Sequence, residues 1–598
     1  MIISRTEAAF LITQLIVMAV AGFSLWFKIS LPITYYLMIL SLAIIFLLQL
    51  EFTKKRRTSF FIFSLILAVL FMRNVYYIAT NYSIIPFGDG NWDYGVVKTF
   101  LSEGQAYVIN EQNPELVLLN WYSGWPLLHI LAVCLYQVSG INAYQVALFL
   151  PSVIGTCSLA FVYLLIDKMR KFLKLSSEVT GLALFLYSVS PEALFWTIQF
   201  VRQNLGILFL VITLYFFYRS WTKPEDRKYQ VLTAFSAITL IMVHHFTSFV
   251  LVLYLLLFSV LLILGKYLSR TRFGKRLFWE LPNVAVARML SGLGLISLVF
   301  LFAWWSDYGT TIWPTVTSGI TRFVRILTGI MQIEYLPSAA SYPIVLTPMW
   351  VRTMAILRDA FIYVAAILGL IVVIMKFSNT PHKFFVTYST LIFGLIFVID
   401  NFVFRQETYR LITLALPFLS LLGAILYEYA KNKLKWTKHI PVISLIMAFL
   451  LFYSFIGLWG HSFAPLHLYD PSINAIEVGE RNTDFVRAGK FFVEAIPIDR
   501  FQIIGVDDYA PLIRFLNTSD YSKILRLNSE YVESEPSSNE LIGAFKDLFI
   551  YVYYGRGFSL IKDPQESSQV RYQLYDRLAE QHNRIYDDGR YRFWVSER

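Results

Sequence analysis

The stretch INAYQVALFLPSVIGTCSLAFVYLL (141–165) decides the fold class, because its 25 residues include no charged side chain. At about 1.5 Å of rise per residue, such a run is long enough to cross a bilayer as a helix. The whole chain has the same character, with 57% hydrophobic and only 15% charged residues. Average soluble domains carry about 25% charged residues. The sequence therefore predicts a polytopic α-helical membrane protein.

Apolar stretches of spanning length recur along the first three quarters of the chain. A further apolar stretch at 126–140 is short for a span, and counting it as one would place basic clusters such as 167–174 and 266–276 outside, against the positive-inside tendency. We therefore expect 126–140 to be an amphipathic helix at the membrane interface. The expected count is about 13 transmembrane helices, at 8–27, 31–50, 59–79, 145–166, 180–198, 204–219, 231–246, 248–265, 289–305, 356–376, 384–403, 410–429 and 439–459.

This topology places the N-terminus in the cytoplasm and large loops at 80–144 and 306–355 outside. We expect the membrane to be the cytoplasmic membrane of a prokaryote. It divides the chain into a transmembrane domain (1–459) and an extracytoplasmic soluble α/β domain (460–598). The tail shows helical spacing at 484–496 and 510–516, strand patterns at 500–508 and 547–555, and a hairpin at 584–595 with Asp-Asp-Gly at its turn.

The formal charge of +11 does not indicate a nucleic-acid partner. The tail holds 16 Lys and Arg against 21 Asp and Glu, a net charge of −5, so the excess of positive charge belongs to the loops between spans. The two cysteines, Cys134 and Cys157, both fall in apolar stretches and form no disulfide framework.

The stretch PFGDGNWDYGVVKTFLSEG (86–104) places two aspartates four residues apart beside the predicted membrane surface. Its start resembles a calcium loop, but Tyr94 and Phe100 stand where glycine and a bidentate glutamate are needed, which excludes an EF-hand. We expect Asp93 to begin a short surface helix that ends near Gly104, with Asp89 in the turn before it.

Three roles for Asp89 and Asp93 remain open from their residue types alone. In the first role, the two aspartates are ordinary turn and N-cap residues, which are common uses of aspartate. A carboxylate beside apolar surface is also well placed to accept a proton from a substrate. Finally, the pair suits a divalent cation, Mg²⁺ or Mn²⁺, that would in turn hold a phosphate.

The acidic motif, the helix ending in Ser-Glu-Gly, the segment YSGWPLLH (122–129) and the following span together resemble the membrane-embedded GT-C glycosyltransferases. This group includes the aminoarabinose transferase of lipid A, the protein O-mannosyltransferases and the oligosaccharyltransferases, which take sugars from polyprenyl-phosphate lipids. The resemblance implies that Asp89 is the first catalytic acid. Gly90 stands where many relatives carry a second acid, so Asp93 is the candidate for that role.

A lipid-phosphate donor also requires cationic groups at the outer ends of the spans. Arginine suits phosphate oxygens, and ionisable residues at membrane depth call for a functional hypothesis. Snorkelling to headgroups and a structural histidine pair are the alternatives. The candidates for donor phosphate binding are Arg202, Arg405, Arg410, His244 and His245.

The resemblance implies acceptor and sugar contacts in the two outer loops. Aromatic rings suit sugar stacking, although membrane interfaces also collect them. The candidates are Trp92, Trp121, Tyr122, His129 and Glu334.

These observations favour an inverting glycosyltransferase that moves a sugar from a polyprenyl-phosphate donor to a glycan, lipid or protein acceptor on the extracytoplasmic face. One alternative is a transporter or flippase of lipid-linked saccharides, which would place charged residues at mid-membrane and show internal symmetry. Another is a membrane-anchored scaffold that binds a partner through the tail.

Overall fold

A computed structural model describes residues 5–27, most of 37–49, 58–79, 85, 88–104, 122–268, 284–309, 312–328, 349–403 and 408–433, together with five strands in the tail. All statements below concern these residues.

The described part of the first half of the chain is largely helical. Its helices are α1 (Arg5–Trp26), α3 (Thr58–Ala79), α4 (Gly88–Glu103), α6 (Leu127–Ser139), α7 (Ala143–Phe172), α8 (Ser177–Val189), α9 (Pro191–Ile198) and α10 (Arg202–Thr222). The second half adds α11 (Arg227–Val243), α12 (His245–Leu268), α14 (Val284–Asp307), α15 (Trp313–Leu327), α16 (Met349–Lys376), α17 (Pro381–Val403) and α18 (Thr408–Lys433).

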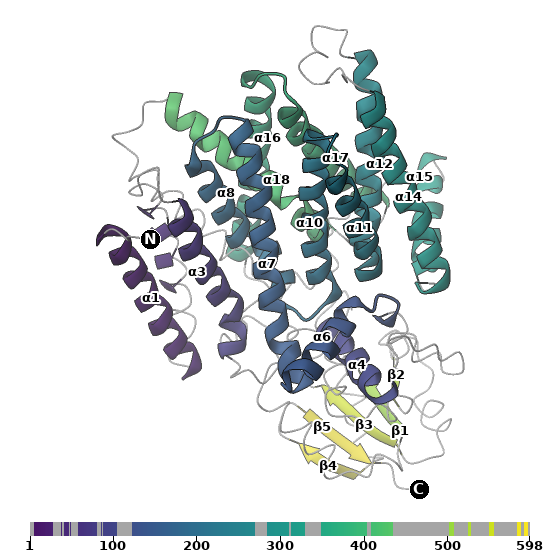
Figure 1. Ribbon diagram of the computed structural model, residues 1–598. Coiled ribbons are helices and arrows are strands. Elements are labelled where there is room, and N and C mark those ends of the chain that lie inside the picture. Colours follow the sequence, from purple (N-terminus) through teal and green to yellow (C-terminus); the bar gives the residue numbers. More distant parts are fainter. Residues whose placement is uncertain are drawn as a thin grey trace.

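The helices form a bundle (Figure 1). In the described part of the chain, six helices are long and apolar enough to cross a membrane, namely α1, α7, α10, α12, α17 and α18. Large apolar side chains such as Ile16 of α1 and Val299 of α14 are more than half exposed, as expected for contact with lipid. The chain is therefore a polytopic helical membrane protein. The stretch 439–459 lies outside the described residues, so the count of 13 spans stays a prediction.

The predicted single span 180–198 is wrong in one respect, because two helices replace it. α8 ends at Val189 and α9 begins at Pro191, with Ser190 extended at φ −63° and ψ 130° between them. Proline lacks a backbone N–H and disfavours helical geometry in the residue before it, so the helix stops there. The residues that follow α9 also run extended as far as Val201, before α10 begins.

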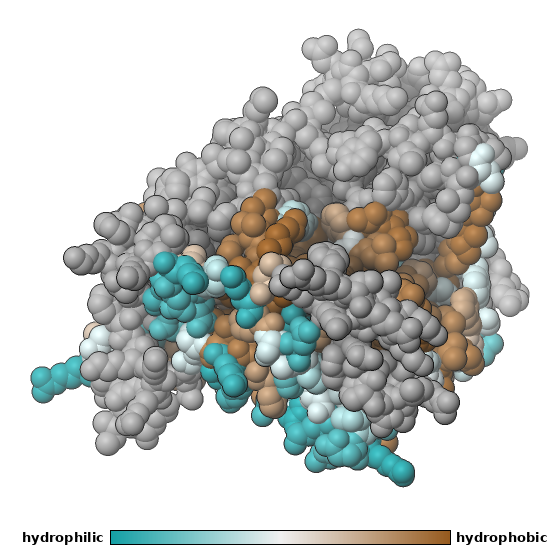
Figure 2. All heavy atoms as spheres, turned by 90° about the horizontal axis from the view of Figure 1, so that it is seen from above, coloured by the Kyte–Doolittle hydropathy of each residue, from teal (hydrophilic) through white to brown (hydrophobic). Residues whose placement is uncertain are grey.

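α4 and α6 lie together across one end of the bundle, below α7 and α10 in Figure 1; we call this the α4/α6 end. α6 has 13 residues, or about 20 Å of helix, which is too short to cross a bilayer. Gly140 ends it in the left-handed conformation, with φ 68°. Figure 2 looks onto the opposite end, where hydrophilic residues gather in front of hydrophobic ones.

Five strands of the tail form one mixed sheet in the order β2-β1-β3-β5-β4. β1 (Gln502–Val506) pairs in parallel with β2 (Ile524–Leu527) and β3 (Phe549–Tyr554), and β5 (Tyr591–Val595) pairs antiparallel with β3 and with β4 (Asn583–Asp587). The three predicted strand regions are confirmed, and β2 was not predicted. The predicted helices at 484–496 and 510–516 lie outside the described residues, so the α/β domain stays a prediction.

Candidate active site

The acidic helix α4 begins earlier than the sequence predicts. It starts at Gly88, so Asp89 lies in its first turn and Asp93 one turn further on. Position 90 requires glycine because there is no room for a side chain. A Cβ there would lie 2.8 Å from Ile85 Cγ2 and 3.4 Å from the Phe200 carbonyl oxygen. Close tertiary packing therefore outweighs the low helix propensity of glycine. The predicted end at Gly104 is confirmed, with φ 74°.

Asp93 is buried where α4, α6 and α10 meet. Its Oδ1 lies 2.7 Å from His129 Nε2 and 2.9 Å from Arg202 Nε. Its Oδ2 accepts a hydrogen bond of 3.3 Å from the backbone N–H of Arg202. Both oxygens of this carboxylate are thus engaged, and a guanidinium balances its charge.

His129 is fully buried, and the structure assigns its tautomer through its neighbours. Since Asp93 accepts, Nε2 must carry a proton, and the buried Nδ1 has no hydrogen-bond partner among the described residues. Burial lowers the pKa of His129, although the hydrogen bond and the charge of Asp93 raise it. The imidazole is therefore neutral near pH 7 and acts as a fixed hydrogen-bond donor to Asp93.

Arg202 begins α10 and is enclosed by aromatic rings from the segment before α6. Its guanidinium carbon lies 4.3 Å from the centre of the Tyr122 ring and 5.5 Å from that of Trp125. It also donates a 3.2 Å hydrogen bond to the Tyr122 carbonyl. Tyr122 in turn stacks on Trp92 with ring centres 6.3 Å apart. The rings predicted to hold sugar thus also help to hold Arg202 in place.

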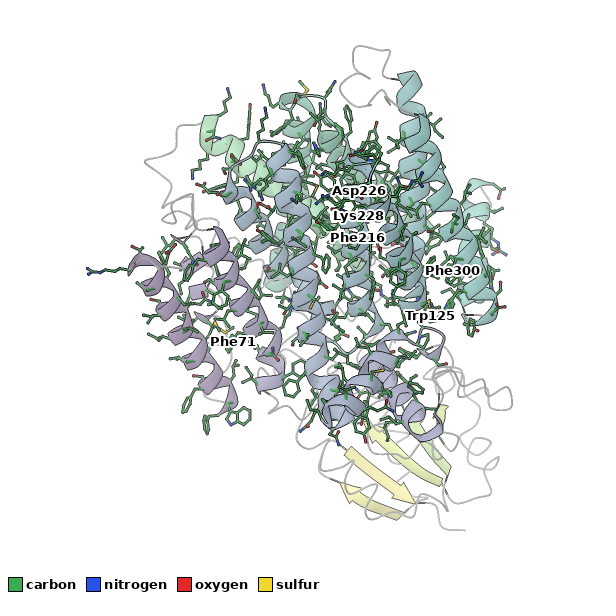
Figure 3. All side chains as sticks on the ribbon, viewed as in Figure 1. Phe71, Trp125, Phe216, Asp226, Lys228 and Phe300 are labelled. Carbon is green, nitrogen blue, oxygen red and sulfur yellow. The ribbon has the colours of Figure 1, made fainter. Side chains whose placement is uncertain are left out.

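The two histidines lie where α11 gives way to α12. His244 is extended between the helices, and its Nδ1 accepts from the backbone N–H of Thr247 at 3.2 Å, so Nε2 carries the proton. The rings of His244 and His245 lie 4.6 Å apart, and the His245 ring lies 4.8 Å from Trp125. Figure 3 labels Trp125 near the end of α14, below Phe300.

The structure brings together four of the five residues predicted for donor phosphate. Arg202 and Arg410 are both near enough to act electrostatically on His244 and His245. Arg410 is placed by Trp196 of α9, whose ring centre lies 5.0 Å from its guanidinium carbon. Arg405, together with Trp121, Glu334 and the side chain of Asp89, lies outside the described part of the structure.

The predicted divalent cation does not fit Asp93 as its contacts stand. A metal ion would have to compete with the guanidinium of Arg202 for the same carboxylate. Among the described residues, no group of three or more His, Cys, Asp or Glu side chains is arranged to hold a metal ion. Because the side chain of Asp89 lies outside the described residues, the divalent cation stays a prediction.

Sequence reasoning missed one residue near this site, Arg73 of α3. It is fully buried within the apolar part of the helix and donates from Nε to Thr197 Oγ1 at 3.0 Å. A lone arginine in the apolar run LILAVLFMRNVYY (65–77) is the signal that would have found it, since such residues in spans are rare and usually functional.

Comparisons with known proteins agree with this fold. No protein-family model and no curated protein sequence matches the chain. The solved structure of the Archaeoglobus fulgidus oligosaccharyltransferase in its apo form matches 84% of this chain and 70% of that chain, with a TM-score of 0.50 and 12% identity. ArnT from Cupriavidus metallidurans bound to undecaprenyl phosphate matches 90% of this chain and 98% of that chain, with a TM-score of 0.49 and 12% identity. The chain shares the fold of the archaeal enzyme, so the GT-C resemblance is confirmed for the fold.

Proposed function

We propose that this protein is a membrane glycosyltransferase that moves a sugar from a polyprenyl-phosphate lipid to an acceptor at the α4/α6 end. The observation that carries the proposal is the buried ion pair between Arg202 and Asp93 of the acidic helix α4, beside the Trp125 ring that also contacts His245. The fold shared with an oligosaccharyltransferase supports this class, although a fold alone does not determine a reaction.

The donor phosphate is assigned to the two arginines and the histidine pair. Guanidinium groups bind phosphate oxygens through paired N–H donors, and neutral imidazoles add further N–H groups. The polyprenyl tail would lie along the apolar faces of the spanning helices. Charge on the departing phosphate grows as the bond to the sugar breaks, so these groups stabilise the transition state more than the bound donor.

The contacts of Asp93 suggest a division of labour between the two acids. Asp93 is buried, forms an ion pair with the Arg202 guanidinium, and accepts hydrogen bonds from His129 and from the backbone N–H of Arg202. We therefore assign it to positioning Arg202. Asp89 lies four residues earlier on the same helix, and residues with this spacing share a helix face. We assign Asp89 as the base that accepts the acceptor proton or positions an acceptor amide.

The reaction then proceeds as one displacement with inversion. The acceptor hydroxyl oxygen attacks the anomeric carbon while its proton passes to Asp89. The bond between the anomeric carbon and the phosphate oxygen breaks, and its electron pair leaves with the polyprenyl phosphate. Acceptors in this scheme are a glycan, a lipid or a protein. Trp92, which is only partly buried, is the ring best placed to meet a sugar.

The test is sugar transfer by the purified protein from radiolabelled polyprenyl-phosphate sugars. We expect Asp89→Asn to lower turnover by about 100-fold or more, the usual loss for a general base. Asp226→Asn is the matched control, because this aspartate lies towards the opposite end of the bundle and pairs with Lys228 at 3.2 Å (Figure 3). Its turnover should equal that of the wild type.

Two results would contradict these assignments. Turnover by Asp89→Asn equal to that of the wild type would remove Asp89 from catalysis. Movement of intact lipid-linked saccharide across proteoliposome membranes, without any transfer of sugar, would support the transporter alternative and overturn the enzyme.

A further inference from the structure

The turn between α9 and α10 determines where Arg202 lies. α9 ends at Ile198, the chain runs extended with Gln199 at ψ 144° and Val201 at ψ 149°, and α10 begins at Arg202. Extended residues have no helical hydrogen bonds of their own, so other elements must hold them.

Side chains from two other helices hold this turn. Asn204 of α10 donates from Nδ2 to the carbonyls of Thr197 and Gln199, at 3.2 and 3.4 Å. Tyr77 of α3 donates to the carbonyl of Ile198. One helical turn earlier on α3, Arg73 donates to the hydroxyl of Thr197. The chain is thus held at three successive residues, Thr197, Ile198 and Gln199, where α9 passes into the turn.

Arg73 is a costly residue to place there, which argues for a role beyond packing. It is fully buried in an apolar helix, and no carboxylate pairs with it among the described residues. Its space depends on Gly155 of α7, where a Cβ would lie 3.0 Å from Arg73 Nε and 2.6 Å from Thr197 Cβ. An apolar side chain would fill the same space without burying a charge.

We propose that Arg73 is a positioning residue for Arg202: by holding Thr197 at the end of α9 it fixes the turn 199–201 and sets how Arg202 meets Asp93 and the donor. The part of this inference that concerns the donor rests on the proposed function. The part that concerns the turn does not.

Two threonines give a matched pair of variants. Arg73 donates from Nε to Thr197 of α9 and from Nη1 to Thr156 of α7, at 3.0 and 3.3 Å. Each hydroxyl also donates to the carbonyl four residues earlier in its own helix, at 2.6 and 2.7 Å. Thr197→Val and Thr156→Val therefore remove the same kinds of bond, but only Thr197 adjoins the turn.

The first measurement is hydrogen–deuterium exchange of the peptide covering 198–204 in the full-length protein without ligand. Loss of one hydrogen bond to a charged group should speed exchange in Thr197→Val by about three- to tenfold, with Thr156→Val within about twofold of the wild type. Equal effects of the two variants, or none from Thr197→Val, would overturn the inference.

The second measurement is the affinity of the full-length protein for a polyprenyl phosphate, together with its unfolding temperature. Arg73→Met should weaken binding by about three- to tenfold. Its unfolding temperature should fall no further than that of Arg219→Met, a half-buried arginine of α10 remote from the turn, because both threonines keep their intrahelical bonds.

Weaker binding only in proportion to lost stability would mean that Arg73 is merely structural. If the wild type fails to bind polyprenyl phosphate at all, the proposed function fails, while the exchange comparison still decides the role of Arg73.

Discussion

Asp93 and Arg202 stand 109 positions apart in the chain, yet the backbone N–H and the side chain of Arg202 both bind the Asp93 carboxylate. A carboxylate held by a main-chain and a side-chain donor has little rotational freedom. The pair therefore links the orientation of α4 to the first turn of α10, and with it the acidic helix to the arginine that we propose to bind phosphate.

Replacing only one member of this ion pair should lower the stability of the protein more than replacing both. Arg202→Met leaves a buried carboxylate unpaired, for which we expect about 3–5 kcal/mol of lost stability. The double variant Asp93→Asn/Arg202→Met should recover part of that loss. Unfolding of the four proteins in detergent forms a double-mutant cycle, and strict additivity would show that the two groups do not interact.

The stability of the protein should fall in mild acid because of His129. Burial holds its pKa below the ordinary value of about 6.5 despite the opposing effect of Asp93, so the unfolded chain takes up a proton at a higher pH than the folded chain. The contribution of His129 to the free energy of unfolding is complete above the pKa of this residue in the unfolded chain, and it is lost as the pH falls below that pKa. His129→Gln keeps a donor for Asp93 and should flatten the dependence of unfolding temperature on pH between about 8 and about 5. Parallel curves for the two proteins would contradict this.

Gly90→Ala should destabilise the protein even though alanine is the better helix former. The added Cβ would lie 2.8 Å from Ile85 Cγ2, so we expect a loss of about 1–3 kcal/mol from overpacking. Adding Ile85→Ala should restore part of this stability in thermal unfolding. A gain from Gly90→Ala alone would show that the site has more room than its contacts indicate.

The contact between α16 and α18 requires a glycine at 369. A Cβ at Gly369 would lie 2.2 Å from the Leu422 carbonyl oxygen, whereas one at Gly394 of α17 meets nothing within 4 Å. Backbones approach closely in membrane bundles where small residues face each other. Gly369→Ala should therefore cost about 1–3 kcal/mol, and Gly394→Ala should be neutral or slightly stabilising. Equal unfolding temperatures for the Gly369→Ala and Gly394→Ala variants would contradict this prediction.

The sequence predicts the spans well and the contacts poorly. Apolar length alone placed both ends of α10 within three residues and the start of α7 within two, because lipid imposes one pattern on every span, but it ended α7 six residues too early. The break at Ser190 was missed because apolar residues continue on both sides of it, and only Pro191 carried the signal. β2 was missed because it is only four residues long.

Within the site, residue types suggested which side chains to propose for phosphate binding, but no pattern could reveal which of them contact each other. His129 was a candidate for sugar contact, and only the fold shows that it faces Asp93. Arg73 was missed because a single charge in a long apolar run changes the average hydropathy very little. Contacts between distant segments depend on how helices pack, which periodicity does not record.

The meeting of α4, α6 and α10 has a consequence for biosynthesis. At about 5–20 residues per second, the ribosome needs some 5–20 seconds after making Asp93 before Arg202 emerges. Throughout that interval the nascent carboxylate lacks its countercharge, so burying it would be unfavourable. We therefore expect α4 to stay in water, and this end to close late in membrane insertion, once a helix more than a hundred residues downstream has been made.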